Sequence, residues 1–126
     1  FQGCQDPLDP HYQALNKMKG QLQTFKNFRD QPYILHELPL PSAIYECSNS
    51  TSKQRLPASY ANFLIANNAV FLPIYNVPQD TIAIEILKKA LPEHKVMPID
   101  CTLLIRQYGS LHCITMQIPI ATRTYS

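Results

Sequence analysis

The sequence predicts an α/β fold, and three observations support this prediction. Between about residues 60 and 99, two apolar runs flank the dipeptide Asn67-Asn68, and an amphipathic stretch and a third apolar run follow. Asparagine tolerates the positive φ of a two-residue hairpin turn, so the first two runs are expected to be paired strands. Because the amphipathic stretch has helical periodicity, the order is strand, strand, helix, strand, which is a ββαβ module. The first forty residues have the pattern of a helix and a strand, as in the tail of a similar module.

The first element expected is a helix over residues 10–26. Asp9 is its expected N-cap, and Pro10 suits the first helical position because its fixed φ is already helical. Prolines end a short strand predicted at residues 33–38. The apolar side chains of the helix recur three or four positions apart and form one stripe, made of Tyr12, Leu15, Met18, Leu22 and Phe25.

Residues 42–57 are expected to form a surface loop, because the stretch from Ser42 to Arg55 is polar. Strands are predicted at residues 59–66 and 69–75, on either side of the asparagine turn. A single domain, residues 1–126, would thus contain the tail of one module (1–41), the loop (42–57) and a final module with the last strand (58–126).

A second helix is predicted at residues 80–91, and strands at 95–99 and 112–118. Asp80 is expected to cap this helix. Lys88 and Lys89 suit its C-terminal end, where the helix dipole favours positive charge.

Length, composition and charge exclude several classes of protein. The 126 residues are 45% hydrophobic and 16% charged, which is typical of one globular domain rather than a disordered chain. The net charge of +2 is spread along the chain, and Lys88-Lys89 is the one adjacent basic pair, so no nucleic-acid partner is expected. No apolar run reaches the roughly 18 residues of a membrane span, so no membrane partner is expected. The chain begins with Phe1 rather than methionine, and we expect this start to be a processing site or a fragment boundary.

Four cysteines leave open four kinds of chemistry: disulfide, metal ligand, buried thiol and nucleophile. They are Cys4, Cys47, Cys101 and Cys113. None of them forms the close sequence pair of a zinc site, so no metal is expected. Reduced thiols in a cytosolic protein are favoured over disulfides, because a chain this apolar does not need cross-links. From the residues alone, Cys113 is most often a buried structural thiol.

Three blocks of the sequence, taken together, carry a resemblance to a known family. They are LPASYANFLIANNAVFLPIYN, then A..ILKKALPEHKVMPID, then GSLHCITMQIP. In content and order they resemble the C-terminal third of the agmatine deiminase family, which is related to bacterial peptidyl-arginine deiminase within the guanidino-group-modifying enzymes. The start of the first helix, DPLDPHYQAL, resembles the segment that precedes the family's equivalent helix.

The resemblance implies a pseudo-fivefold α/β propeller of ββαβ modules, of which this chain would hold roughly the last two. It implies a bacterial, cytoplasmic hydrolase of polyamine (putrescine) biosynthesis that needs no cofactor and converts agmatine and water to N-carbamoylputrescine and ammonia. Cys113 corresponds to the family's nucleophile, which would form a covalent amidino-cysteine. Gly109 and Ser110 would belong to the loop that faces the substrate. Gly109 is what remains of the family's glycine run, and Ser110 replaces an asparagine.

The family's catalytic histidine and guanidinium-binding carboxylates lie upstream of these 126 residues. The chain would therefore carry the nucleophile without its partners and be inactive alone. The expected partners are a small-molecule guanidine substrate, the missing N-terminal part of the same protein and, as an open option, a second copy of the protein. The alternatives are a free- or peptidyl-arginine deiminase of the same superfamily, and a folded non-catalytic fragment or interaction module.

Four other residues invite alternative readings. Asn62, in an apolar strand, either orients a loop near the site or is a hydrogen-bonded core amide. Tyr108, where the family has glycine, either shapes the pocket or lies on the surface. His112 is expected to be packed or hydrogen-bonded rather than a general base, on the opposite strand face from Cys113, because strand side chains alternate. Arg55 either pairs with a carboxylate elsewhere or is an exposed loop arginine, and the exposed position is the one expected.

Overall fold

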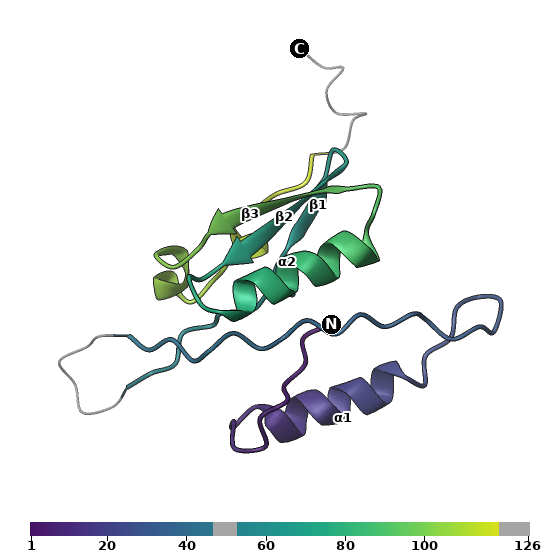
Figure 1. The fold of residues 1–126 in the computed structure, drawn as a ribbon, viewed down its shortest axis with the longest axis horizontal. Helices are drawn as coiled ribbons and strands as arrows, with labels where there is room; N and C mark the ends of the chain where they lie inside the picture. The colour runs from purple at the N-terminus through teal and green to yellow at the C-terminus, as the bar shows by residue number, and fades with distance from the viewer. Residues whose placement is uncertain (47–52, 119–126) are drawn as a thin grey trace, which may run out of the picture.

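The computed structural model describes residues 1–46 and 53–118, which form two α-helices, a three-stranded sheet and two short 3-10 helices (Figure 1). In chain order the elements are α1 (Tyr12–Leu22), β1 (Leu64–Ala66), β2 (Ala69–Ile74), α2 (Gln79–Ala90), β3 (Lys95–Asp100), η1 (Leu104–Gln107) and η2 (His112–Ile114). The predicted α/β class is confirmed.

The sheet has the order β1-β2-β3, with β1 antiparallel and β3 parallel to the central strand. Asn67 and Asn68 form the turn between β1 and β2 with φ values of 49° and 60°, as the hairpin prediction required. The chain leaves β2, passes through α2 and returns as β3, so the predicted strand, strand, helix, strand order is confirmed.

The hydrophobic core surrounds β2, whose residues are buried on both faces of the sheet. Figure 1 shows α2 lying across one face, where Ala83 and Leu87 are buried. Burying a leucine side chain such as Leu87 contributes roughly 1.5–3 kcal/mol, so this contact holds α2 on the sheet. The largest fully buried side chains are Tyr60, Tyr75, Leu38, Leu72, Ile105, Val70, Pro73 and Cys101.

Asp80 does not cap α2 as predicted, because the helix begins one residue earlier, at Gln79. Its buried carboxylate instead accepts hydrogen bonds from three donor groups that precede the helix. The Tyr75 N–H lies 3.1 Å from Oδ1 and the Val77 N–H 3.2 Å from Oδ2. The Tyr60 hydroxyl donates to Oδ1 over 2.5 Å. Asp80 therefore fixes the turn that joins β2 to α2.

Helix α1 is shorter than the predicted 10–26. The carboxylate of Asp9 accepts the His11 backbone N–H over 2.8 Å, which closes a turn before the helix rather than capping it. The predicted apolar stripe is half-buried inside the helix, but Phe25, beyond its end, is 55% exposed. In Figure 1, α1 lies apart from the sheet.

Two predicted strands are wrong. Residues 33–38 are extended but form one isolated parallel bridge, Gln2 to Leu38, and Ile34 is 86% exposed. Residues 112–118 begin with the 3-10 turn η2 and form no ladder. Apolar alternation alone does not make a strand, because the backbone groups also need a neighbouring strand, and the described sheet ends at β3.

The strand predicted at residues 59–66 is reduced to β1. Residues 59–62 form a turn instead, closed by the Asn62 N–H donating to the Ser59 carbonyl oxygen over 3.2 Å. The polar segment predicted as a loop also has structure at its ends. The Glu46 N–H donates to the Gln54 carbonyl oxygen over 3.0 Å, so the two arms pair.

Candidate active site around Cys113

Cys113 lies on the 3-10 turn η2, and its side chain is exposed to solvent. The turn is closed locally, by the Thr115 N–H that donates to the His112 carbonyl oxygen over 3.0 Å. Leu111, just before the turn, is buried and fixes it to the core. Successive side chains of a 3-10 helix point about 120° apart rather than to opposite faces. His112 is therefore exposed beside Cys113, and the prediction of a packed histidine is wrong.

Asn62 lies directly beside the cysteine, as in the first of the two alternatives that its sequence position left open. Its Oδ1 accepts the backbone N–H of His112 over 2.7 Å. This contact sets the orientation of the amide, so the Nδ2 donor faces Cys113 Sγ at 3.3 Å. Asn62 thus connects the turn before β1 to the turn that carries the thiol.

The groups around the sulfur favour the thiolate. The backbone N–H of Ser110, the side chain of Asn62 and the N–H of Cys113 itself lower the pKa of the Cys113 thiol, with Ser110 contributing most. Hydrogen bonds to the charged form stabilise it, because they replace water at the sulfur. A lower pKa is what a cysteine nucleophile requires, since the thiolate is the reactive form.

Gly109 packs closely against Cys113, and a side chain at this position would crowd the cysteine. A Cβ at this position would lie 3.3 Å from Cys113 Cβ and 3.9 Å from Sγ. The turn does not depend on left-handed backbone at this glycine; the left-handed residue is Tyr108, with φ 61° and ψ 24°. A side chain in that conformation costs roughly 1–2 kcal/mol.

Tyr108 is half-exposed, and its hydroxyl lies 2.9 Å from Glu46 Oε2 and 3.1 Å from Gln54 Oε1. These contacts connect the cysteine loop to the paired arms of the segment predicted as a surface loop. Tyr108 is thus a surface residue that is also held in place.

Ser110 presents its backbone and its side chain to different surroundings. The backbone N–H faces Cys113, whereas the hydroxyl is buried and lies 2.8 Å from the Tyr75 hydroxyl. The three predicted site residues therefore lie together, and Gly109 and Ser110 face Cys113 with their backbone rather than with a side chain.

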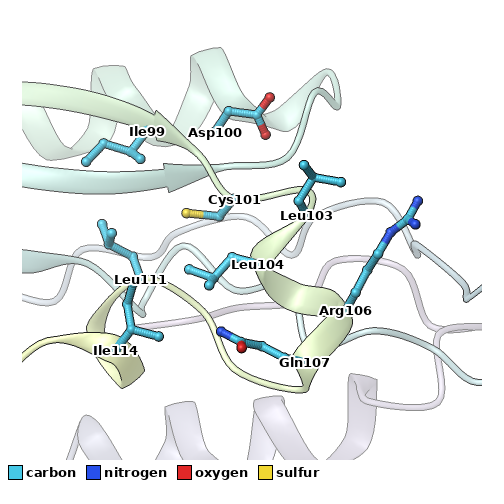
Figure 2. Close-up of a pocket in the computed structure, with 9 residues that line it drawn as sticks. All are labelled: Ile99, Asp100, Cys101, Leu103, Leu104, Arg106, Gln107, Leu111 and Ile114. Atoms are coloured by element: carbon cyan, nitrogen blue, oxygen red, sulfur yellow. The ribbon is translucent and has the colours of Figure 1, made fainter.

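A hollow of about 680 Å³ lies next to this loop, beyond the carboxyl end of β3. Figure 2 shows Leu111 and Ile114 on one side of it and Leu104, Arg106 and Gln107 of η1 on the other. Its lining is mostly apolar. Cys113 is not part of the lining, so the sulfur lies beside the hollow and not inside it.

Asp100 also lines this hollow, and the sequence did not single it out. The hydroxyl and backbone N–H of Thr102 and the Asn76 amide lower the pKa of its carboxyl group. The Asn76 Nδ2 donates to Asp100 Oδ2 over 2.9 Å, and the Thr102 N–H donates to Oδ1 over 2.9 Å. These partners occupy both oxygens, so Asp100 stabilises the turn after β3.

Arg55 is not the exposed loop residue that was expected. Its guanidinium is partly buried and lies 2.8 Å from the Asp9 carboxylate. Burial would raise the pKa of Asp9, but the hydrogen bonds from the His11 N–H and from Arg55 lower it to about 2. The pair connects the start of α1 to the strand-like arm at residue 55.

The other two described cysteines are buried, in contrast to Cys113. Cys4 and Cys101 are buried free thiols, and burial raises the pKa of Cys101. Cys47 lies outside the described residues. Within residues 1–46 and 53–118, no three histidine, cysteine, aspartate or glutamate side chains gather as metal ligands. The same residues contain no helix with the length and apolar character to cross a membrane.

Comparisons with known proteins agree on one family. Residues 1–119 match the sequence profile described as Porphyromonas-type peptidyl-arginine deiminase. A relative in Vibrio parahaemolyticus is 36% identical over 90% of this chain and 35% of its own length. An agmatine deiminase of Pseudomonas syringae pv. tomato is 32% identical over 90% of this chain and 34% of its own length.

Solved structures give the same result. The structure of a C. jejuni agmatine deiminase variant with substrate bound is 40% identical, with a TM-score of 0.75, over 88% of this chain and 30% of that one. A structure from Porphyromonas gingivalis is 41% identical, with a TM-score of 0.87, over 95% of this chain and 34% of that one. The chain thus spans about a third of the length of the proteins that it matches.

Proposed function

Because the chain belongs to the Porphyromonas-type peptidyl-arginine deiminase family, we propose that it is the C-terminal, cysteine-bearing portion of a hydrolase that releases ammonia from a guanidinium group. One observation carries the proposal: the Asn62 amide donates to an exposed cysteine sulfur over 3.3 Å, at a thiol whose pKa is lowered by the backbone of Ser110 and by Asn62. A structural thiol is usually buried among apolar groups, as Cys101 is in this chain.

The reaction would proceed in two steps. The Cys113 thiolate attacks the guanidinium carbon, and one nitrogen leaves as ammonia after it receives a proton, which yields an amidino-cysteine. Water then adds to the same carbon, loses a proton and displaces the thiolate, which yields the ureido product. The donors around the sulfur would hold the thiolate before the first step and receive it again after the second.

The remaining catalytic groups are proposed to lie on the part of the protein that precedes this chain. A guanidinium needs carboxylates that bind its nitrogens in pairs and an acid that protonates the leaving ammonia. Two described carboxylates in this half of the chain already have partners of their own: Asp80 holds the turn before α2, and Asp100 holds the turn after β3. This chain alone is therefore proposed to be inactive.

We propose agmatine as the substrate. The similar protein of Pseudomonas syringae is named an agmatine deiminase, and so is the C. jejuni protein whose structure contains bound substrate. The products would be N-carbamoylputrescine and ammonia. The second candidate is peptidyl or free arginine, which the description of the matching family favours. The two substrates differ at the end away from the guanidinium, where an amine is replaced by a carboxylate or a peptide.

We further propose that the chain holds the last two modules of a five-module propeller. The parallel bridge between Gln2 and Leu38 spans α1, in the same way that the parallel pair β2 and β3 spans α2. The segment before α1 and the segment after it would then belong to a sheet whose first strands precede this chain.

The test uses the intact protein that contains this sequence. It is incubated separately with agmatine, free arginine and an arginine-containing peptide, and released ammonia is measured. Agmatine is expected to be the substrate, and Cys113→Ala is expected to abolish turnover while substrate binding is retained. Mass spectrometry should find the adduct on the tryptic peptide of residues 107–123, in which Cys113 is the one cysteine. An adduct on another cysteine, or no turnover of any guanidine, would overturn the proposal.

A further inference from the structure

We propose that Tyr75 and Ser110 are positioning residues for Cys113, and that the buried hydrogen bond between their hydroxyls holds the Ser110 backbone N–H beside the sulfur. The proposal rests on the proposed function in one respect, because it assumes that Cys113 is the nucleophile. It adds to that function a connection from the core to the reactive thiol.

The two hydroxyls are held deep in the core. Tyr75 is 1% exposed and Ser110 is 2% exposed, and their oxygens lie 2.8 Å apart. The Tyr75 hydroxyl also donates to the Ser59 carbonyl oxygen over 2.9 Å and accepts the Ser59 N–H over 3.0 Å. A phenol has one hydrogen, and here it goes to the Ser59 carbonyl, so Ser110 is the donor in the bond between the hydroxyls.

This bond determines where the backbone of the cysteine loop lies. The side chains of Ser110 and Leu111 are both buried, so two successive residues fix the loop to the core. Gly109, on the other side of Ser110, lies against Cys113 without a side chain between them. The Ser110 N–H is left facing the sulfur, and it lowers the pKa of the Cys113 thiol more than any other group does.

The titratable groups near Ser110 do not change charge near pH 7, so they do not mask the effect of the Ser110 N–H on the Cys113 thiol. Burial raises the pKa of Tyr75 and the pKa of Cys101, the two titratable groups that face Ser110, so both stay neutral near pH 7. The groups that lower the pKa of Cys113 within the described chain are N–H donors. His112 is the titratable side chain next to Cys113 on the turn, and the variants below leave it unchanged.

The expected consequence is a change in thiol reactivity. Tyr75→Phe removes the acceptor of the Ser110 hydroxyl, so the loop loses one of its two attachments to the core and the Ser110 N–H moves away from the sulfur. A net hydrogen bond changes an equilibrium by about threefold to tenfold. Alkylation of Cys113 by iodoacetamide at pH 7 should therefore slow by about threefold to tenfold, and the difference should disappear at high pH, where the thiol is ionised in both proteins.

The chain contains a matched control. Tyr60 is as deeply buried as Tyr75, the two rings lie 5.6 Å apart, and the Tyr60 hydroxyl also donates a buried hydrogen bond, to Asp80. Tyr60→Phe thus makes the same chemical change in the same layer of the core without touching Ser110. It should lower stability while the pH profile of Cys113 alkylation stays as in the parent protein.

The experiment measures the pH dependence of iodoacetamide labelling in the intact protein, by mass spectrometry of the peptide of residues 107–123. Tyr75→Phe and Ser110→Ala should both shift the profile to higher pH, and Tyr60→Phe should not. If Tyr75→Phe does not fold, Ser110→Ala decides, since it removes the same bond from the other side. Unchanged profiles in the folded variants, or an equal shift in Tyr60→Phe, would overturn the proposal. Failure of the proposed function would appear separately, as ammonia release that survives Cys113→Ala.

Discussion

The hydrogen bond between Tyr60 and Asp80 leads to the most quantitative prediction for this chain. The Asp80 carboxylate is buried and accepts from the Tyr60 hydroxyl and from the backbone N–H groups of Tyr75 and Val77. Hydrogen bonds to a charged group contribute roughly 1.5–3 kcal/mol each, and a buried donor without an acceptor costs roughly 1–3 kcal/mol. Asp80→Ala removes the acceptor of all three donors and should lower the free energy of unfolding by about 3–5 kcal/mol.

Asp80→Asn should be milder, because the amide retains one oxygen. That oxygen can face the two backbone N–H groups, while the new NH₂ group faces the Tyr60 hydroxyl. The hydroxyl can then accept a hydrogen bond but has no acceptor for its own hydrogen. The expected loss is about 1–2 kcal/mol.

A double-mutant cycle isolates the bond itself. Tyr60→Phe should cost about 1.5–3 kcal/mol in the parent protein, and less in the Asp80→Asn background, where the hydroxyl has already lost its acceptor. The assay is urea unfolding of the intact protein, followed by circular dichroism. An equal cost of Tyr60→Phe in the two backgrounds would refute the reasoning, since it would mean that the hydroxyl gains nothing from Asp80.

Two further predictions concern the cysteine turn and the start of α1. Asn62→Asp keeps the oxygen that accepts the His112 N–H, so the turn should persist, but it replaces the donor to Cys113 by a negative charge. The negative charge disfavours the thiolate, so alkylation of Cys113 at pH 7 should slow. Alkylation as fast as in the parent protein would contradict this. Against the effect of burial, the His11 N–H and then Arg55 hold the pKa of Asp9 at about 2, below its ordinary 3.8, so the stability that these contacts provide is fully present above pH 3.8 and is lost as the pH falls through about 2. Arg55→Gln should therefore flatten the fall in the urea midpoint between these two pH values, and an unchanged slope would show that the pair contributes nothing.

The sequence by itself determined the module in the second half of the chain. The apolar runs around Asn67-Asn68 and the amphipathic stretch after them gave β2, α2 and β3 within a residue or so of their observed ends. These elements are predictable because their signals are local: the turn needs residues that accept positive φ, and the helix needs a stripe of apolar side chains. The family resemblance also came from the sequence, since each of its three blocks is an unbroken stretch of chain that can be recognised without a structure.

Tertiary structure decided which apolar stretches became strands. Residues 33–38 and 112–118 have strand-like patterns, but a strand also needs a neighbour for its backbone hydrogen bonds. Within residues 1–46 and 53–118, the chain supplies only an isolated bridge at Leu38 and a local turn at Cys113. A sequence pattern describes one segment at a time and holds no information on what lies beside it.

The surroundings of the thiol were likewise decided by the fold. Cys113 could be named as a nucleophile from the resemblance, but its three donors come from positions far apart or from the backbone: Asn62 is 51 residues away, and Ser110 contributes its N–H. The attachment of Ser110 to Tyr75 crosses 35 residues of sequence. Each of these contacts exists because the hydrophobic core brings β2, the turn before β1 and the cysteine loop together, and burial then requires every polar group among them to find a partner.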